Sequence, residues 1–261
     1  MPTPLQAARR SMTIVLPAYN EAKRIGPALD ELFGYLDAAP VNGIHPRIDV
    51  LVVDDGSNDG TAALVRSRPE SARQLGDDPV SLAVLSVPHG GKGSAVKAGM
   101  LAATGDLVVF ADADMATPPE ELPKLIEALE SADVALGSRI QPDGSDMRAT
   151  QPRYRRFLGG VFHALASIWV VGDVRDTQCG FKGFTREAAQ DLFSRQQVTS
   201  IVFDVELIHL ARRRGYRLVI VPIRWRDVRG SRMRPTAGLA LKVAWDLFRI
   251  PLLHRGVRRR T

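Results

Sequence analysis

The chain has 261 residues, 45% of them hydrophobic and 25% charged, with a formal net charge of +6. This composition excludes a disordered chain, and the length suits one large domain or two small ones. The single cysteine excludes a disulfide framework and a cysteine-based zinc site, and indicates a reducing compartment. No apolar stretch reaches the roughly 18 residues that a membrane-spanning helix needs.

Short apolar, β-branched runs alternate with helical patterns along the first half of the chain. The strongest runs lie at 13–16, 48–53, 82–87 and 107–111, and weaker ones at 134–137 and 218–222. Amphipathic helices are expected near 21–38, 60–74, 93–103 and 119–130. Runs that are apolar on both faces are typical of parallel strands buried between helices. We therefore expect an α/β fold, with a mainly parallel sheet flanked by helices in a single domain.

The pattern changes after residue 140. Residues 141–156 are polar and predict a long loop, whereas residues 157–172 are almost entirely apolar. Further on, residues 237–250 predict an amphipathic helix that Pro251 ends. The polar side chains of this helix form one narrow stripe, made of Lys242, Asp246 and Arg249.

Positive charge is concentrated at the C-terminal end. Residues 201–261 hold 15 Lys and Arg but only 4 Asp and Glu. Such a segment indicates an anionic partner, and the alternative is an arginine-rich solvated surface. Because the apolar helix is followed by Arg255 and residues 258–260, it could lie flat on an anionic membrane. The competing interpretation is a helix packed on the sheet with an exposed basic tail.

Two acidic pairs follow predicted strands. Asp54 and Asp55 end the second run, and Asp112 and Asp114 follow the fourth. Ligands of open α/β sheets bind beyond the carboxyl ends of the strands, and four carboxylates gathered there repel unless a cation lies among them. Carboxylates at positions i and i+2 can aim at one point and suit Mg²⁺ or Mn²⁺. The neighbouring polar residues 57–59 are better explained as turn-formers.

A glycine-rich loop at residues 89–94 invites a comparison with phosphate-binding motifs. It matches neither the P-loop nor the dinucleotide-binding spacing, so neither class is supported. Lys92 nevertheless stands where a loop enters a helix, and could meet an anion there. The alternative is a solvated loop lysine.

Several motifs then identify a family. They are Pro17-Ala-Tyr-Asn-Glu21, Val53-Asp-Asp-Gly-Ser57, Gly91-Lys-Gly93, Asp112-Ala-Asp114, Gly137-Ser-Arg139, Asp176-Thr-Gln-Cys-Gly-Phe-Lys182 and Phe203-Asp-Val-Glu206. In this order they resemble the inverting glycosyltransferases of family 2, which have the GT-A fold. Within that family they are most similar to the polyprenyl-phosphate sugar synthases, and above all to the dolichyl-phosphate β-glucosyltransferases.

The resemblance implies roles for individual residues. It assigns the nucleotide to Pro17, Tyr19, Glu21, Asp54 or Asp55, and Lys92. It assigns the metal to Asp112 and Asp114, with Asp112 also at the diphosphate. It assigns the catalytic and acceptor groups to Asp176, Arg139 and Arg153, and the pocket around the sugar to Gln178 and Asp204. For Glu206 a structural role is an equal alternative, and residues 200–203 could close over the acceptor. Ala116 stands where mannosyl members often have a glutamine, which favours the glucosyl interpretation.

The implied reaction is transfer of a hexose, with glucose from UDP-glucose favoured, to a polyprenyl or dolichyl phosphate with inversion, using Mg²⁺ or Mn²⁺. Alternatives are another donor sugar, a soluble or glycan acceptor, or a membrane-recruited module that binds nucleotide sugars without catalysis. Nucleic acid is not an expected partner, because no basic stretch is interleaved with aromatic residues. We expect a cytoplasmic protein on the cytosolic face of the membrane, docked directly or through a membrane-protein partner. The predicted organisation is a disordered N-terminus at 1–11, a GT-A domain at 12–235, and an amphipathic helix with a basic tail at 236–261.

Overall fold

The computed structural model describes residues 10–38, 47–74, 78–147, 174–228 and 237–260. The strands are β1 (Met12–Ala18), β2 (Ile48–Asp54), β3 (Val80–Ser86), β4 (Leu107–Ala111), β5 (Val134–Ser138), β6 (Phe181–Thr185) and β7 (Leu218–Pro222). The α-helices are α1 (Ile25–Ala38), α2 (Thr61–Arg66), α3 (Lys92–Ala102), α4 (Leu122–Ser131), α6 (Arg186–Arg195), α7 (Phe203–Arg214) and α8 (Ala237–Leu253). Two short 3₁₀ helices are η1 (Pro69–Ala72) and η2 (Pro119–Glu121).

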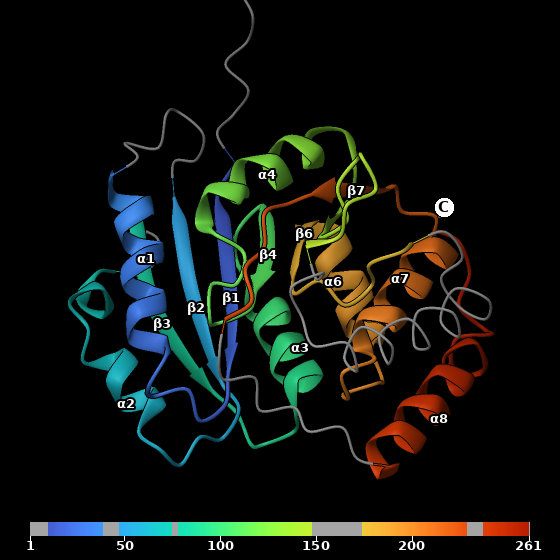
Figure 1. Cartoon of the computed structure of the whole chain (residues 1–261), viewed down its shortest axis with the longest axis horizontal. Coiled ribbons are helices and arrows are strands. Elements are labelled where there is room, and N and C mark those ends of the chain that lie inside the picture. The colour runs from blue at the N-terminus through green and yellow to red at the C-terminus, as the bar shows by residue number, and fades with distance from the viewer. Residues whose placement is uncertain (1–9, 39–46, 75–77, 148–173, 229–236, 261) are drawn as a thin grey trace, which may run out of the picture.

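The seven strands form one sheet in the order β3-β2-β1-β4-β6-β5-β7 (Figure 1). Every neighbouring pair is parallel except the two that involve β6, which runs antiparallel to β4 and β5. β1 pairs with β2 so that Ala18 stands opposite Asp54 at the carboxyl end of both strands. The segments that follow β1, β2 and β4 therefore leave the sheet at one edge.

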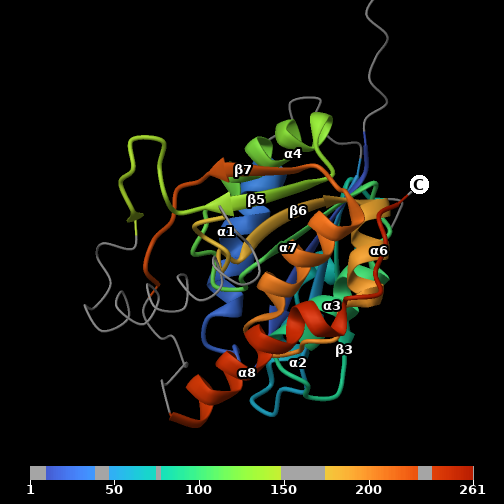
Figure 2. The ribbon, with the colours of Figure 1, turned by 90° about the vertical axis from the view of Figure 1, so that its right-hand side faces the viewer.

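Helices cover both faces of the sheet, because alternate residues of each central strand point to opposite cores. Ile14 and Leu16 of β1 pack with α1, α2 and α4, whereas Val15 packs with the side chains of α3, α6, α7 and α8. Figures 1 and 2 show the resulting three layers, with α8 as the outermost helix beside α7. The predicted α/β fold with a mainly parallel sheet is confirmed.

The structure corrects two details of the sequence analysis. β6, α6 and α7 were not predicted, and the charged Lys182 in the middle of β6 explains why its short segment does not resemble a buried strand. α8 continues through Pro251 to Leu253, because a proline in the last turn removes only one helical hydrogen bond. The apolar segment 157–172, most of the predicted loop at 141–156 and nearly all of residues 1–11 lie outside the described residues. Within the described ranges, no helix is long and apolar enough to cross a bilayer.

Candidate active site

The loops that follow β1 and β2 are tied together by hydrogen bonds. The backbone N–H of Asn20 donates to Ser57 Oγ at 2.8 Å, and the Asn20 side chain accepts from the N–H of Asn58 at 2.9 Å. Asp59 Oδ2 accepts from the N–H of Ala22 at 3.1 Å. Residues 57–59 thus hold the two loops together, which agrees with the structural role preferred for them, and these bonds fix the position of the residues just after β1.

Tyr19 carries an aromatic ring at the edge of this loop. It is 39% exposed and stacks on His89, with ring centroids 4.1 Å apart and planes 22° from parallel. Glu21, two residues later, is held by Arg24 in a two-point ion pair, with a shortest distance of 2.5 Å. Pro17 precedes both at the end of β1. A partly exposed pair of stacked rings offers a flat surface that suits a planar ring of a ligand. His89 was missed by the sequence reasoning, although it directly precedes the glycine-rich loop.

Asp54 and Asp55 are both buried, and both shape loops. Asp55 Oδ1 accepts from the N–H of Gly90 at 2.8 Å, and its Oδ2 accepts from the N–H of Gly91 at 3.0 Å. His89 Nδ1 lies 2.8 Å from the same carboxylate. Asp54 accepts from the backbone of its own turn. Asp55 therefore sets the conformation of the loop that leads into α3, and the contact of Asp54 or Asp55 with a nucleotide stays a prediction.

Lys92 begins α3 and reaches across the edge of the sheet. Its Nζ donates to Asp112 Oδ1 at 2.6 Å. Burial alone would lower the pKa of Lys92, but the charges of Asp112 and Asp204 outweigh that effect and raise it. Lys92 is therefore a cation paired with the aspartate that follows β4, and not an unpaired loop lysine.

Asp112 and Asp114 follow β4 in a turn with a left-handed residue, Met115, at φ 48°. Burial, together with the charge of Asp112, raises the pKa of Asp114, although Arg24 lies 3.8 Å from its carboxylate. Two carboxylates that repel each other at a sheet edge favour a bound cation.

The donor set fits a hard divalent ion that keeps most of its positions for water or phosphate oxygens. In the described part of the chain no cluster of three or more His, Cys, Asp or Glu side chains could hold a metal. Asp112 and Asp114 stay the predicted ligands of such an ion.

Gly180 brings a second segment against Asp112. The backbone N–H of Asp112 donates to the Gly180 carbonyl at 3.0 Å. A Cβ atom at position 180 would overlap the Asp112 carboxylate. Only glycine fits this close approach, so Gly180 helps to set where that carboxylate lies.

A buried ion pair lies behind these residues. Lys182 of β6 is fully buried and donates to Asp204 Oδ1 at 2.5 Å and to the Cys179 carbonyl at 2.5 Å. Its ammonium group lies 5.3 Å from the ring centroid of Phe110. Burial raises the pKa of Asp204, and the nearby ammonium group of Lys182 opposes that rise. The sequence motif contains Lys182, yet nothing in the sequence indicates that its partner is Asp204.

Arg139 follows β5 and is bound to Asp176 through three hydrogen bonds. Its backbone N–H and its Nε both donate to Asp176 Oδ2, at 2.8 and 2.9 Å, and its Nη2 donates to Oδ1 at 2.6 Å. The guanidinium carbon lies 5.6 Å from the ring centroid of Trp225. Both Asp176 oxygens are thus engaged, so this carboxylate fixes Arg139 in place and is a poor candidate for a strong base.

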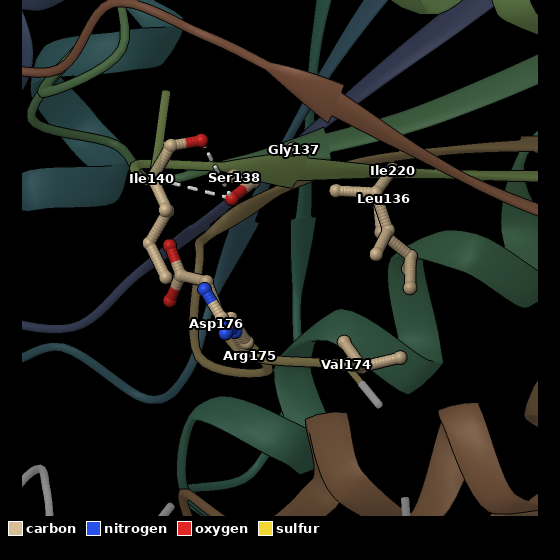
Figure 3. A pocket seen from close by; sticks show the side chains of 8 residues that line it. All are labelled: Leu136, Gly137, Ser138, Ile140, Val174, Arg175, Asp176 and Ile220. Atoms are coloured by element: carbon tan, nitrogen blue, oxygen red, sulfur yellow. Dashed lines mark hydrogen bonds between the residues drawn. The ribbon is translucent and has the colours of Figure 1, made fainter. Parts of the chain in front are cut away.

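A cavity of about 130 Å³ lies beside this ion pair. Figure 3 shows that the aliphatic side chains of Leu136, Val174 and Ile220 gather at one end, while Ser138, Ile140 and Asp176 lie at the other. The cavity therefore has an apolar end and an end that mixes polar and apolar groups.

Two further predicted residues differ in what they contact. The Nε2 atom of Gln178 is buried and has no hydrogen-bond partner among the described residues, as expected of a donor that meets a ligand. Glu206 is fully buried and accepts from the backbone N–H groups of Gln197 and Val198, both at 2.9 Å, while His254 Nε2 lies 2.7 Å from its Oε1. Of the two roles considered for Glu206, the contacts support the structural one.

Several of the predicted residues lie at the carboxyl edge of the sheet. Lys92 of α3 bonds Asp112 after β4, and Gly180 touches the same aspartate. Asp176, four residues before Gly180, binds Arg139 after β5. A common site for the donor-side and acceptor-side residues stays a prediction. Arg153 lies outside the described residues, so its predicted role stays a prediction.

A family model described as glycosyl transferase family 2 matches residues 13–193. The chain belongs to glycosyltransferase family 2. The dolichyl-phosphate beta-glucosyltransferase ALG5C of Trichomonas vaginalis is 38% identical, over 97% of this chain and 74% of the relative. The dolichyl-phosphate beta-glucosyltransferase of Drosophila melanogaster is 36% identical, over 92% of this chain and 74% of the relative.

Among solved structures, this family 2 member is similar to glucosyl-3-phosphoglycerate synthase of Mycobacterium tuberculosis, crystallised with Mn²⁺, UDP-glucose and phosphoglyceric acid. The TM-score is 0.62 at 21% identity, covering 97% of this chain and 82% of that one. A likeness at this identity concerns the fold, and it agrees with the GT-A architecture expected from the motifs.

Proposed function

We propose that this glycosyltransferase transfers glucose from UDP-glucose to a dolichyl or other polyprenyl phosphate and inverts the anomeric centre. The observation that carries the proposal is that two cations lie at the same edge of the sheet: Lys92, bonded to Asp112, and Arg139, bonded to Asp176. A sugar–nucleotide donor and a phosphate acceptor both bring negative charge, and such a site supplies cationic groups for both. The relatives named dolichyl-phosphate beta-glucosyltransferase support this choice of donor sugar and acceptor.

On the donor side, we assign the base to the surface formed by Tyr19 and His89. The glycine-rich loop that Asp55 holds leads to Lys92, whose ammonium group is available to the diphosphate. Asp112 and Asp114 would hold Mg²⁺ or Mn²⁺, which when bound neutralises charge that develops on the departing diphosphate. The Mn²⁺ in the structural neighbour is consistent with this assignment.

On the acceptor side, we assign the phosphate to Arg139. A phosphate monoester near pH 7 is largely dianionic, since its second pKa is about 6, so it attacks the sugar without a strong base. Asp176 would act by orienting the guanidinium group, and Gln178 would donate to an oxygen of the sugar. The cavity beside Asp176, with its apolar end, suits the first part of an isoprenoid chain.

Because the acceptor is a lipid, we propose that the protein acts at a membrane surface, and the cytosolic face is the one that we expect. The decisive experiment is a donor and acceptor screen with the full chain, Mn²⁺ or Mg²⁺, and radiolabelled UDP-glucose, UDP-galactose, UDP-N-acetylglucosamine or GDP-mannose. We expect label from UDP-glucose to enter the organic phase only with dolichyl or polyprenyl phosphate, in a β linkage. Transfer to a soluble acceptor without lipid phosphate, or no transfer with any donor, would overturn the proposal.

A paired variant separates the role of Arg139 from its structural contact. Arg139→Gln alone leaves the buried Asp176 carboxylate without its partner, so it is compared with Arg139→Gln/Asp176→Asn, which removes both charges. We expect the folded double variant to keep its affinity for UDP while its KM for the lipid phosphate rises at least about tenfold, which is the scale of one charge-assisted contact. A loss of UDP affinity with an unchanged acceptor KM would contradict the assignment.

A further inference from the structure

α8 presents an apolar surface to the solvent. Its large exposed side chains recur at intervals of four, three and four residues, which places them on one face of a helix. Leu241 is 74% exposed, Trp245 61%, Phe248 49% and Leu252 52%, and these four side chains are called the α8 ridge below. The rings of Trp245 and Phe248 lie 6.0 Å apart, so the middle of the ridge is one continuous aromatic surface.

The inner face of α8 holds a charged group as well as apolar ones, whereas the inner face of an ordinary surface helix is apolar. Asp246 is 2% exposed, accepts from Ser200 Oγ at 2.6 Å and pairs with Arg249 at 2.8 Å. Just after the helix, His254 is buried against Glu206 at 2.7 Å. Leu247 and Ile250 complete the buried face. These contacts fix the orientation of α8, and as a result the ridge faces the solvent.

The chain beyond the ridge is positively charged. After Asp246 the sequence contains five arginines and no acidic residue. Arg255, Arg258 and Arg259 are exposed, and the segment that carries them is held by the last turn of α7 through Arg213, which donates to the Arg255 carbonyl at 2.9 Å. The apolar, aromatic ridge is followed along the chain by these cationic groups, beginning with Arg255 three residues after Leu252. Such a combination complements an anionic lipid surface, where acyl chains take the apolar side chains and head groups take the arginines.

The position of α8 relates this surface to the candidate active site. In Figures 1 and 2, α8 lies toward the end of the molecule at which β1 and β2 finish. Its inner face contacts Ser200, and the neighbouring carbonyl of Thr199 accepts from the N–H of Gly93 in the first turn of α3, beside Lys92. If the outer face of α8 docks on a lipid surface, these contacts therefore fix the position of the candidate active site relative to that surface.

We propose that the α8 ridge is a docking surface for an anionic phospholipid bilayer. The choice of a bilayer over a second copy of the chain rests on the arginines that follow the ridge along the chain, since like-charged copies would repel. The proposal depends on the proposed function in one respect: docking would give the enzyme access to a lipid acceptor. Vesicle binding itself can be measured without any glucose transfer.

The test is flotation of the full chain with vesicles of phosphatidylcholine alone or of phosphatidylcholine and phosphatidylglycerol. We expect binding to the anionic vesicles, and a partition coefficient at least about tenfold lower for Trp245→Gln/Phe248→Gln, which removes two inserted aromatic side chains. Arg258→Gln/Arg259→Gln should reduce binding to anionic vesicles, whereas Arg66→Gln/Lys124→Gln, on the opposite face of the sheet, should not.

Circular dichroism and urea unfolding verify that each variant is folded. If the wild type does not float with anionic vesicles, or if the ridge variant floats equally well, the proposal is wrong. It is also wrong if the wild type is a dimer in solution that Trp245→Gln/Phe248→Gln converts to monomers without loss of vesicle binding. Glucose transfer to a short-chain, water-soluble prenyl phosphate separates the two proposals. The ridge variant should keep this activity. If the wild type binds vesicles but does not transfer glucose, the proposed function is contradicted and the docking proposal is not.

Discussion

The ammonium nitrogen of Lys92 lies 2.6 Å from Oδ1 of Asp112, so the first residue of α3 is paired with the aspartate that follows β4. This contact joins a glycine-rich loop to the carboxylate that we assign to a divalent cation. It also keeps a positive charge at the place where a nucleoside diphosphate would carry its negative charge.

Replacing Lys92 should weaken binding of the diphosphate specifically. For Lys92→Met we expect the Kd for UDP to rise about tenfold or more, because one charge-assisted contact is lost, while the Kd for uridine changes little. Calorimetry in the presence of Mn²⁺ measures both. Lys97→Met, in the same helix but bonded to the Gln196 carbonyl, is the matched control and should leave UDP binding unchanged. Equal losses for UDP and uridine would contradict a diphosphate contact.

The two carboxylates after β4 should carry the metal dependence. Asp114→Asn should lower Mn²⁺ affinity in the presence of UDP and reduce glucosyl transfer by roughly 10²-fold or more, since a metal ion supplies several kcal/mol of charge stabilisation. Chelation of the metal should abolish transfer, and added Mn²⁺ or Mg²⁺ should restore it. Asp106→Asn, just before β4, serves as the control because Asp106 bonds Ser11 at the opposite end of the strand. Unchanged Mn²⁺ binding in Asp114→Asn would rule out this ligand.

Gly180 should tolerate no side chain. Gly180→Ala adds a Cβ atom that overlaps the Asp112 carboxylate, so the carboxylate or the loop must move. We expect a folded variant with Mn²⁺ affinity and activity reduced at least about tenfold, because small displacements of positioning groups are costly. Gly34→Ala in α1 meets no atom within 4 Å, and it should leave activity unchanged. A fully active Gly180→Ala enzyme would show that this close approach is unimportant.

Removing one charge of the Lys182–Asp204 ion pair should destabilise the fold more than removing both. Lys182→Met leaves a buried carboxylate without its partner, and we expect the free energy of unfolding to fall by about 3–5 kcal/mol. Lys182→Met/Asp204→Leu removes both charges and should recover a large part of that loss. Urea denaturation of the two variants and the wild type measures the difference. A double variant less stable than Lys182→Met would show that Asp204 has another essential contact.

Asp191 should give a pH-dependent contribution to stability. Burial opposes its charge, but hydrogen bonds from Arg214, Arg195 and Tyr216 outweigh this effect and hold the pKa of Asp191 below its ordinary value. A carboxylate with a lowered pKa stabilises the fold above that ordinary value, and the stabilisation disappears as the pH falls through the pKa of the folded state. Asp191→Asn should therefore cost about 1–3 kcal/mol at pH 7 and less near pH 3. Urea unfolding at both pH values measures this. If the stability difference between the wild type and Asp191→Asn is the same at both, the ionised carboxylate of Asp191 is not its source.

Local patterns in the sequence predict much of the fold and part of the site. The runs at 48–53 and 107–111 are apolar on both faces, which determines buried parallel strands, and the carboxylates after them are ligand candidates because strand ends meet at one edge. β6 was not predicted because Lys182 and Gly183 interrupt its apolar pattern. The strand is stable there because Asp204, more than 20 residues away, neutralises the lysine.

By itself, the sequence determined the family, the alternation of strands and helices, and the identity of the acidic strand ends, since all of these lie in contiguous residues. Only the tertiary structure decided the partner of each charge: Asp176 for Arg139, and Asp112 for Lys92. It also decided that Asp246 points inward and Trp245 outward on α8. The physical reason is that the free energy of a buried charge depends on groups brought together from distant parts of the chain, which no local pattern contains.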